Sequence, residues 1–272
     1  MNSIILFFLF ILGAAIGSFL NVVVLRMRTG MTLGGRSMCM VCGKDLRWYE
    51  LVPIASFLIQ HGRCRECHSK ISEQYVLVET ATAVLFTLAG MFLWSGGYEA
   101  VSLLSLVLIL LILSVFVSIF AYDYLHQIIP DSFVVTLILA GFALVGIDVF
   151  MLGADAALFG VALLSGLTLF IPFFALWFFS KGKWIGLGDG KLAFAIGVIM
   201  PFPSALSAIV LAFWIGAAFG IVYMYISKIR KTHASRAIAF GPFMVIGALI
   251  ALFYPIDLFN IVIVSEYVRT LL

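Results

Sequence analysis

Runs of about 20 apolar residues recur along this sequence, and each is long enough to cross a hydrocarbon core of roughly 30 Å. Hydrophobic residues make up 64% of the chain and charged residues 11%, with a mean hydropathy of +1.21. Because so little polar surface cannot cover a water-soluble globule, we predict an all-α polytopic membrane protein. The long runs are 4–25, 75–94, 101–122, 132–152, 156–179, 203–227 and 238–262, and a shorter run lies at 190–200.

The positions of the basic residues favour about eight transmembrane helices over seven. With eight spans, four loops share one side of the membrane and hold 15 of the 16 lysine and arginine residues. The positive-inside rule makes that side cytoplasmic and puts both termini outside. If the segment 190–200 did not cross the membrane, there would be seven spans, and the basic loop 228–237 would lie outside. The four loops on that side are 26–74, 122–131, 180–191 and 228–237.

The first apolar run resembles a signal peptide only superficially. It is long, no basic residue precedes it, and Arg26 and Arg28 follow it, so we interpret it as a retained helix. The chain then divides into a first transmembrane helix at 1–25, a cytoplasmic loop at 26–74 and a membrane region of seven helices at 75–272.

The loop 26–74 carries all four cysteines, as two Cys-x-x-Cys pairs separated by 21 residues. Disulfides do not persist in the reducing cytoplasm, whereas four thiolates in two turns suit a closed tetrahedral Zn²⁺ site. We therefore predict a structural zinc site rather than four unrelated thiols. The ligands are Cys39, Cys42, Cys64 and Cys67. His61 and His68 flank the second pair, and we expect them to be solvated rather than to replace a cysteine.

Asp123 and Asp189 stand at the same-side ends of apolar spans in an almost charge-free chain. Ionisable groups at membrane depth are costly and usually mark function. Asp123 ends a helix, where the helix dipole disfavours a negative charge. Asp131 follows Pro130 at the start of the next span, so we interpret it as a helix-start acid.

Asp189 lies in a glycine-rich segment with glycines at 186, 188 and 190. A dinucleotide-binding loop would follow a β-strand and have a wider spacing, so we reject that interpretation. The glycines instead allow either a close approach of the backbone or unusual backbone angles around Asp189. Two acids that share a site hold one proton between them. One can take a proton from an attacking water while the other protonates the leaving amine, so we predict an aspartic protease dyad.

Five motifs together resemble the type IV prepilin peptidases, and they occur in that family's order over most of the chain. They are Gly17-Ser-Phe-Leu-Asn21-Val22, the paired cysteines, Asp123 with Pro130-Asp131, Gly186-Leu-Gly188-Asp189 with Lys191-Leu192, and Phe240-Gly241-Pro242-Phe243. The departures are small. Ala239 stands where family members often have Pro, and Glu50-Leu-Val-Pro53 stands where many have Asn before Ile-Pro.

The resemblance implies a bifunctional GxGD aspartic protease of the bacterial cytoplasmic membrane. It implies cleavage of the basic leader of type IV prepilins or pseudopilins after a glycine, at the cytoplasmic face. Asp123 and Asp189 would be catalytic, and the four cysteines would hold zinc. It further implies N-methylation of the new N-terminus with S-adenosylmethionine. The expected partners are these prepilins and membrane lipid, and no nucleic acid is expected.

The methyl-donor site is harder to place, because no soluble methyltransferase pattern is present. The candidates near the cytoplasmic face are Asn21, Glu73 and Glu79, with the zinc loop 26–74 as a scaffold linked to methyl transfer. Asn21 fits a hydrogen bond between helices better than a ligand role. Glu79 fits a helix-start or snorkelling acid as well as it fits a donor site.

Two other functions remain open on the sequence. A proton- or cation-coupled transporter also uses intramembrane acids and a glycine-broken helix, although these acids gather at one face and no inverted repeat is evident. A zinc-dependent membrane scaffold would explain the cysteines but leaves both aspartates unexplained.

Overall fold

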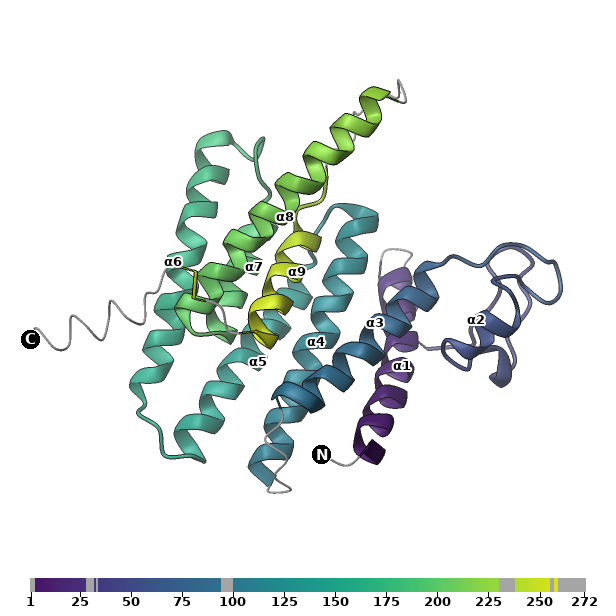
Figure 1. Ribbon diagram of the computed structural model, residues 1–272, viewed down its shortest axis with the longest axis horizontal. Coiled ribbons are helices and arrows are strands. Elements are labelled where there is room, and N and C mark those ends of the chain that lie inside the picture. Colours follow the sequence, from purple (N-terminus) through teal and green to yellow (C-terminus); the bar gives the residue numbers. More distant parts are fainter. Residues whose placement is uncertain are drawn as a thin grey trace, which may run out of the picture. The chain divides into compact units, whose positions relative to one another are not determined.

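The computed structural model describes residues 3–27, 32, 34–93, 100–229, 238–254 and 257–258. These residues form helices joined by short connections, with two isolated β-bridges (Figure 1). In chain order the elements are α1 Ser3–Arg26, η1 Trp48–Glu50, α2 Ala55–Ile59, α3 Gln74–Leu88, η2 Ala89–Leu93, α4 Ala100–His126, α5 Asp131–Phe150, α6 Ala157–Ser180, α7 Leu187–Ile199, α8 Phe202–Ile229 and α9 Gly241–Phe253. The predicted all-α membrane architecture is confirmed.

Six helices in the described part of the chain are long and apolar enough to cross a membrane. They are α1, α3 with its π-helical extension η2, α4, α5, α6 and α8. At the other two predicted spans lie α7 and α9, which have 13 residues each. The count of eight spans therefore stays a prediction. Arg28, Arg269, residues 230–237 and the end of the span 238–262 lie outside the described residues.

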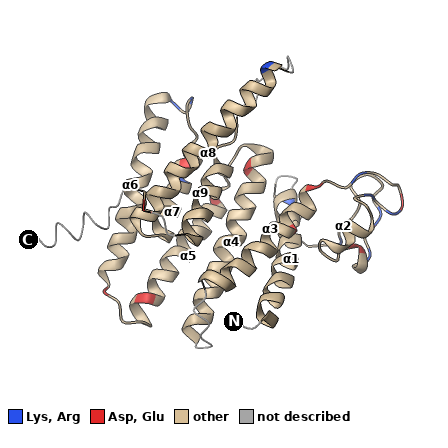
Figure 2. Cartoon of the chain, in the orientation of Figure 1, with Lys and Arg blue, Asp and Glu red and all other residues tan. Residues whose placement is uncertain are grey.

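Charged residues are sparse on the membrane-length helices and gather near helix ends and in the segment between α1 and α3 (Figure 2). This placement is what a hydrocarbon environment requires, because charges at membrane depth are costly. The side of the membrane on which each end lies stays a prediction.

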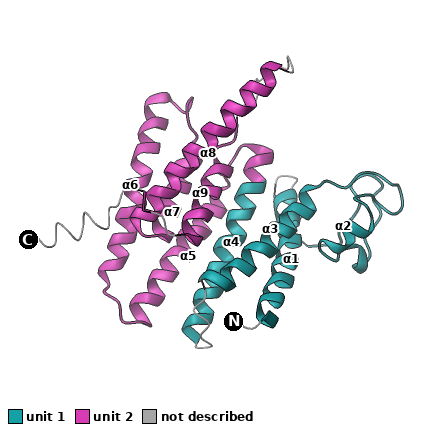
Figure 3. Ribbon diagram, viewed as in Figure 1, with its two compact units in different colours: residues 1–121 teal, residues 122–272 magenta. Residues whose placement is uncertain are grey.

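The chain forms two compact units, Met1–Ala121 and Tyr122–Leu272 (Figure 3). The helix α4 begins in the first unit and its last turn belongs to the second. All four cysteines belong to the first unit, and both Asp123 and Asp189 belong to the second. The predicted division into 1–25, 26–74 and 75–272 stays a prediction.

In the first unit, α1 packs closely against α3 because two glycines lie on the contact face. A Cβ atom on Gly13 would lie 2.7 Å from the Cα of Ala83, and one on Gly17 would lie 2.7 Å from the Cα of Glu79. The two glycines are four residues apart, the small-xxx-small spacing that lets membrane helices approach at backbone distance. The approach brings Glu79 against α1.

In the second unit, the short helix α7 is largely buried. Leu192, Ala193, Ala195 and Ile196 have no exposed surface, and α7 packs mainly against α6 and α5. A Cβ on Gly197 would lie 2.8 Å from the Cα of Gly166 on α6. This enclosure holds the start of α7, where Asp189 lies, in place.

We predict that Gly13→Val destabilises the first unit, because the added side chain meets backbone atoms that cannot move aside. Overpacking of this kind costs about 1–3 kcal/mol. Gly160→Val on α6 is the control, since a Cβ there meets no atom within 4 Å. Thermal unfolding of the purified proteins in detergent measures the difference, and equal midpoints for the two variants would contradict close packing at Gly13.

Candidate functional site

Asp123 lies in the last turn of α4 and is only 4% exposed. The backbone N–H of Gly241 donates to its carboxylate. Gly241 is the first residue of α9, so the acid faces the positive end of that helix dipole. The start of α9 therefore offsets the unfavourable position of Asp123 at the end of α4.

Glycine is required at position 241 because the acid is so close. A Cβ there would lie 2.5 Å from Oδ2 of Asp123 and 3.1 Å from its Cγ. The preceding Phe240 packs between Phe213 of α8 and Phe173 of α6, with ring centres 4.8 and 6.5 Å away. The Phe-Gly-Pro-Phe motif thus anchors the start of α9 against Asp123, a role that the sequence alone did not reveal.

Asp189 is the third residue of α7, so the helix begins before the acid rather than after it. Its Oδ2 accepts a hydrogen bond of 3.2 Å from the backbone N–H of Gly186. Gly186 has ordinary extended angles, with φ −76° and ψ 147°, and the close-approach alternative applies to Gly188 and Gly190. Cβ atoms on these two would lie 3.3 Å from Ile129 and 3.2 Å from Phe173.

The structure brings Asp123 and Asp189 together in the second unit. The negative charge of Asp123 acts on the carboxyl group of Asp189. Ile129 lies against both sites: its side chain is 3.3 Å from a Cβ on Gly188 and 3.2 Å from a Cβ on Gly241. A buried and a half-buried carboxyl group that interact in this way can share one proton.

Asp131 contacts a different residue from those that contact Asp123 and Asp189. It begins α5 directly after Pro130, as predicted for a helix-start acid. Its carboxylate forms an exposed ion pair of 2.7 Å with Lys191 of α7. An ion pair of this kind contributes about 0–1 kcal/mol, so it helps to align the starts of α5 and α7 without being essential to the fold.

The four cysteine sulfurs of the first unit lie within 4.8 Å of one another. Four sulfurs bound at about 2.3 Å to one Zn²⁺ stand roughly 3.8 Å apart, and the sulfurs of Cys39 and Cys67 are separated by 3.8 Å. The backbone N–H groups of Cys42 and Val41 lower the pKa of Cys39, which favours a thiolate at that position, whereas the pKa of the neighbouring Cys42 is raised by burial and by hydrogen bonds with the other thiols. The cluster therefore fits a tetrahedral metal ion.

The two cysteine pairs sit on matching turns. The N–H of Gly43 donates to the carbonyl of Cys39, and the N–H of His68 donates to the carbonyl of Cys64. Both donors adopt the left-handed conformation, with φ of 72° and 55°. His68 thus closes a turn and is exposed, which agrees with the expectation that it is solvated.

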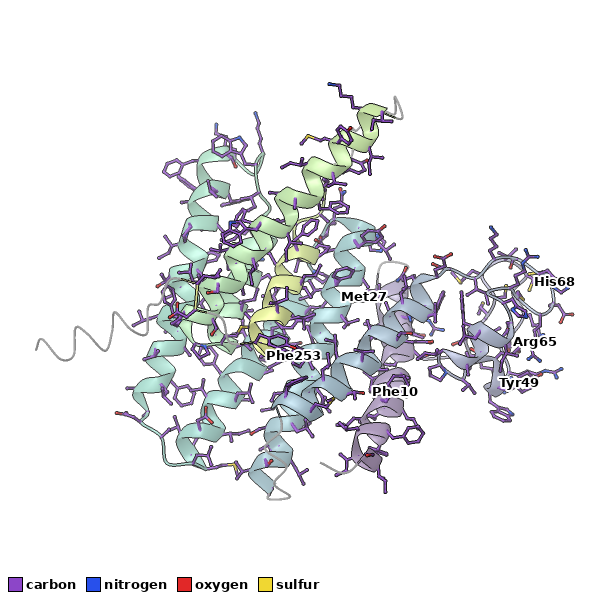
Figure 4. The ribbon with its side chains drawn as sticks, viewed as in Figure 1. Phe10, Met27, Tyr49, Arg65, His68 and Phe253 are labelled. Atoms are coloured by element: carbon purple, nitrogen blue, oxygen red, sulfur yellow. The ribbon has the colours of Figure 1, made fainter. Side chains whose placement is uncertain are left out.

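The folded loop around the cysteines carries further packing of its own. The guanidinium of Arg65 lies 5.1 Å from the centre of the Tyr49 ring (Figure 4), a cation–π distance. Figure 4 also shows His68 in the same loop. Turns, bridges and this contact replace an apolar core, as expected for a metal-stabilised loop.

Of the three methyl-donor candidates, two are buried where α1 packs against α3. Asn21 of α1 is 1% exposed and Glu79 of α3 is 6% exposed, and both face the contact between these helices. Glu73 is exposed and directly precedes α3. Glu79 accepts a 2.7 Å hydrogen bond from the backbone N–H of Ile54.

Sequence reasoning missed Ile54. This β-branched residue has φ 62° and ψ −55°, a strained conformation that costs about 1–3 kcal/mol. The strained turn follows Pro53 and points its N–H at Glu79. No pattern of residue types identifies this contact, because the two residues are 25 positions apart.

Comparison with known proteins covers most of the chain. Residues 11–93 match the family described as the bacterial peptidase A24 N-terminal domain, and residues 106–221 match the type IV leader peptidase family. No solved structure matches the chain. The comparisons give no support to a transporter.

Several relatives carry the name prepilin leader peptidase/N-methyltransferase. The protein from Pseudomonas aeruginosa is 30% identical over 90% of this chain and 88% of its own length. The one from Legionella pneumophila is 31% identical over 83% of this chain and 74% of its own length. The one from Myxococcus xanthus is 36% identical over 80% of this chain, and the match covers 62% of that protein, slightly less than two thirds of it.

We predict that the purified, reduced protein contains one zinc ion per chain and that the double variant Cys39→Ser, Cys42→Ser loses it. Zinc binding and folding of the loop are coupled, so limited proteolysis should cut this variant within 34–73. The control is His68→Asn, which keeps a residue suited to the left-handed conformation and should keep its zinc. Normal metal content after replacement of all four cysteines by serine would refute the site.

Proposed function

Because the chain belongs to the type IV leader peptidase family, we propose that it cleaves the basic leader of type IV prepilins or pseudopilins and N-methylates the N-terminus that cleavage creates. The single observation that carries the peptidase assignment is the pair of carboxyl groups, Asp123 and Asp189, whose charges interact inside the second unit. The transporter interpretation needs acids at the membrane midplane, and these acids lie at helix ends.

In the proposed mechanism the two aspartates hold one proton between them. The ionised carboxylate takes a proton from a water molecule as the water attacks the scissile carbonyl. The protonated partner donates a hydrogen bond to the developing oxyanion and later protonates the leaving amine. The backbone N–H groups of Gly241 and Gly186 hold one carboxyl oxygen of each aspartate, which leaves the other oxygen of each for water and substrate.

The cysteine cluster has a structural role in this proposal, with Zn²⁺ as its metal. A tetrathiolate site leaves no open position for water, so the metal takes no part in peptide cleavage. S-adenosylmethionine supplies the methyl group when it is bound. We place methyl transfer in the first unit, where Asn21, Glu79 and the zinc loop lie.

We propose a multi-pass protein of the bacterial cytoplasmic membrane with both termini outside and both aspartates at the cytoplasmic face. The basic loops between the helices support this orientation. The partners would then be prepilins and the surrounding lipid, with no nucleic acid among them.

We predict that Asp123→Asn and Asp189→Asn each lower prepilin cleavage by at least about 100-fold, because an amide cannot exchange the proton that general acid–base catalysis requires. Asp131→Asn is the control, since it loses only an exposed ion pair. Cleavage is followed by the mobility shift of a detergent-solubilised prepilin. A wild-type rate in either dyad variant would rule out the aspartic mechanism.

A second prediction concerns substrate recognition. The leaders are basic and the cytoplasmic loops are basic, so like charges repel and electrostatic steering is weak. We therefore expect the apolar helix of the substrate to enter from the lipid and to supply most of the binding. A soluble leader peptide should be a far poorer substrate than a complete prepilin. Equal kcat/KM values for the two would instead place recognition in a loop.

A further inference from the structure

A buried polar cluster occupies the contact between α1 and α3 in the first unit. Glu79 accepts hydrogen bonds from the backbone N–H of Ile54, at 2.7 Å, and from the side chain of Ser18. Ser18 lies next to Gly17, whose missing Cβ lets α1 approach the Cα of Glu79. Three separate segments of the chain thus meet at one carboxyl group.

Asn21, on the same side of α1, leaves one acceptor without a partner. Its side-chain N–H₂ group donates to the backbone carbonyls of Gly17 and Tyr75, at 3.3 and 3.1 Å. Carbonyl oxygens only accept, so this assignment fixes the orientation of the amide. The amide oxygen Oδ1 is then buried with no hydrogen-bond partner. A buried polar atom that stays unpaired is rare and calls for a ligand or another explanation.

The cluster also lacks a cation. The ion pairs formed by the described residues do not include Glu79. A buried carboxylate is costly unless it is paired, and here it lies on the same helix contact as an unpaired amide oxygen. Both groups accept hydrogen bonds, so the ligand that they suit is a positively charged N–H donor.

We propose that Glu79 and Asn21 bind the primary ammonium at the new N-terminus of the cleaved pilin and that Glu79 takes a proton from it before methyl transfer. This inference rests on the proposed N-methyltransferase activity. It extends the assignment from the methyl donor, for which these residues were candidates, to the group that accepts the methyl.

The chemistry requires such a base. An ammonium has no lone pair, so one proton must first move from nitrogen to the Glu79 carboxylate. The neutral amine then attacks the methyl carbon of the sulfonium donor, a C–N bond forms, the C–S bond breaks, and the thioether leaves with the bonding electron pair. The product is a methylammonium, and the proton on Glu79 passes to solvent.

The test uses the full-length protein and a pilin that already has a free N-terminus, so that cleavage is not needed. Transfer of a labelled methyl group is measured alongside cleavage of the uncut prepilin. Glu79→Gln keeps an oxygen for Ile54 and Ser18 but cannot take the proton. We expect its methyl transfer to fall by about 100-fold or more, with cleavage within about twofold of wild type since the dyad belongs to the other unit.

The pH profile separates loss of the base from a packing defect. An α-amine has a pKa of about 7.7–8.0, so in Glu79→Gln the rate should rise about tenfold per pH unit below that range, as the amine deprotonates by itself. Tyr75 is the titratable side chain beside Glu79, and its phenol stays neutral over this range. Ser18 and Ile54, which donate to Glu79 from the other segments, do not titrate, and neither does Asn21.

A control and a second variant complete the design. Thr82→Val changes a buried hydroxyl that bonds within its own helix, to Val78. This control should methylate at the wild-type rate. Asn21→Leu removes the unpaired acceptor and should raise the KM for the cleaved pilin more than it lowers kcat.

The methionyl end of the donor carries the same α-ammonium group, so binding of labelled S-adenosylmethionine is measured separately. Unchanged donor affinity in Glu79→Gln supports the proposal, and loss of donor binding overturns it in favour of a donor site. Wild-type methylation by Glu79→Gln also overturns it and leaves the enzyme assignment intact. A wild-type protein that cuts prepilin but never methylates a cleaved pilin would refute the proposed transferase activity together with this inference.

Discussion

In a hydrocarbon environment there is no water to pair with a backbone amide or to solvate an acid, so each must find its partner within the protein. Helices satisfy the backbone. Three acids on the helices, Asp123, Asp189 and Glu79, are satisfied in a different way, because each accepts a hydrogen bond from a backbone N–H group. Asp123 receives one from Gly241, Asp189 from Gly186 and Glu79 from Ile54. In none of these cases is the donor a basic side chain.

This arrangement suits acids that must change protonation state. A lysine or arginine partner would hold a carboxylate permanently ionised, whereas a single N–H group orients the carboxyl group and leaves it free to take up a proton. Asp123 and Asp189 also interact with each other, so a proton can be shared between them. The same local design therefore serves both the proposed peptidase pair and the proposed base for methyl transfer.

Close packing of the backbone brings helix ends and helix faces near these acids. Because Gly241 has no side chain, Asp123 can approach its backbone, and Ile129 can approach Gly188 in the same way. The lack of a side chain at Gly17 lets the backbone of α3 beside Glu79 lie against α1. Of the described glycines at these places, none needs a positive φ. Their importance lies in the absence of a side chain, which lets helix ends and helix faces meet at backbone distance.

The helical membrane fold, the grouping of the four cysteines and the candidate pair Asp123 and Asp189 could be predicted from the sequence, because apolar run length, paired cysteines and acids in an uncharged chain are local signals. The sequence also identified Pro130 and Asp131 as the start of a helix. Only the tertiary structure decided that Asp189 lies inside the first turn of α7, that Gly241 holds Asp123, and that Ile54 reaches Glu79. These contacts join residues as far as 118 positions apart, as with Asp123 and Gly241, and a backbone N–H donor is chemically the same in every residue except proline. No residue type marks it in advance, so only the packing of the helices shows which amide meets which acid.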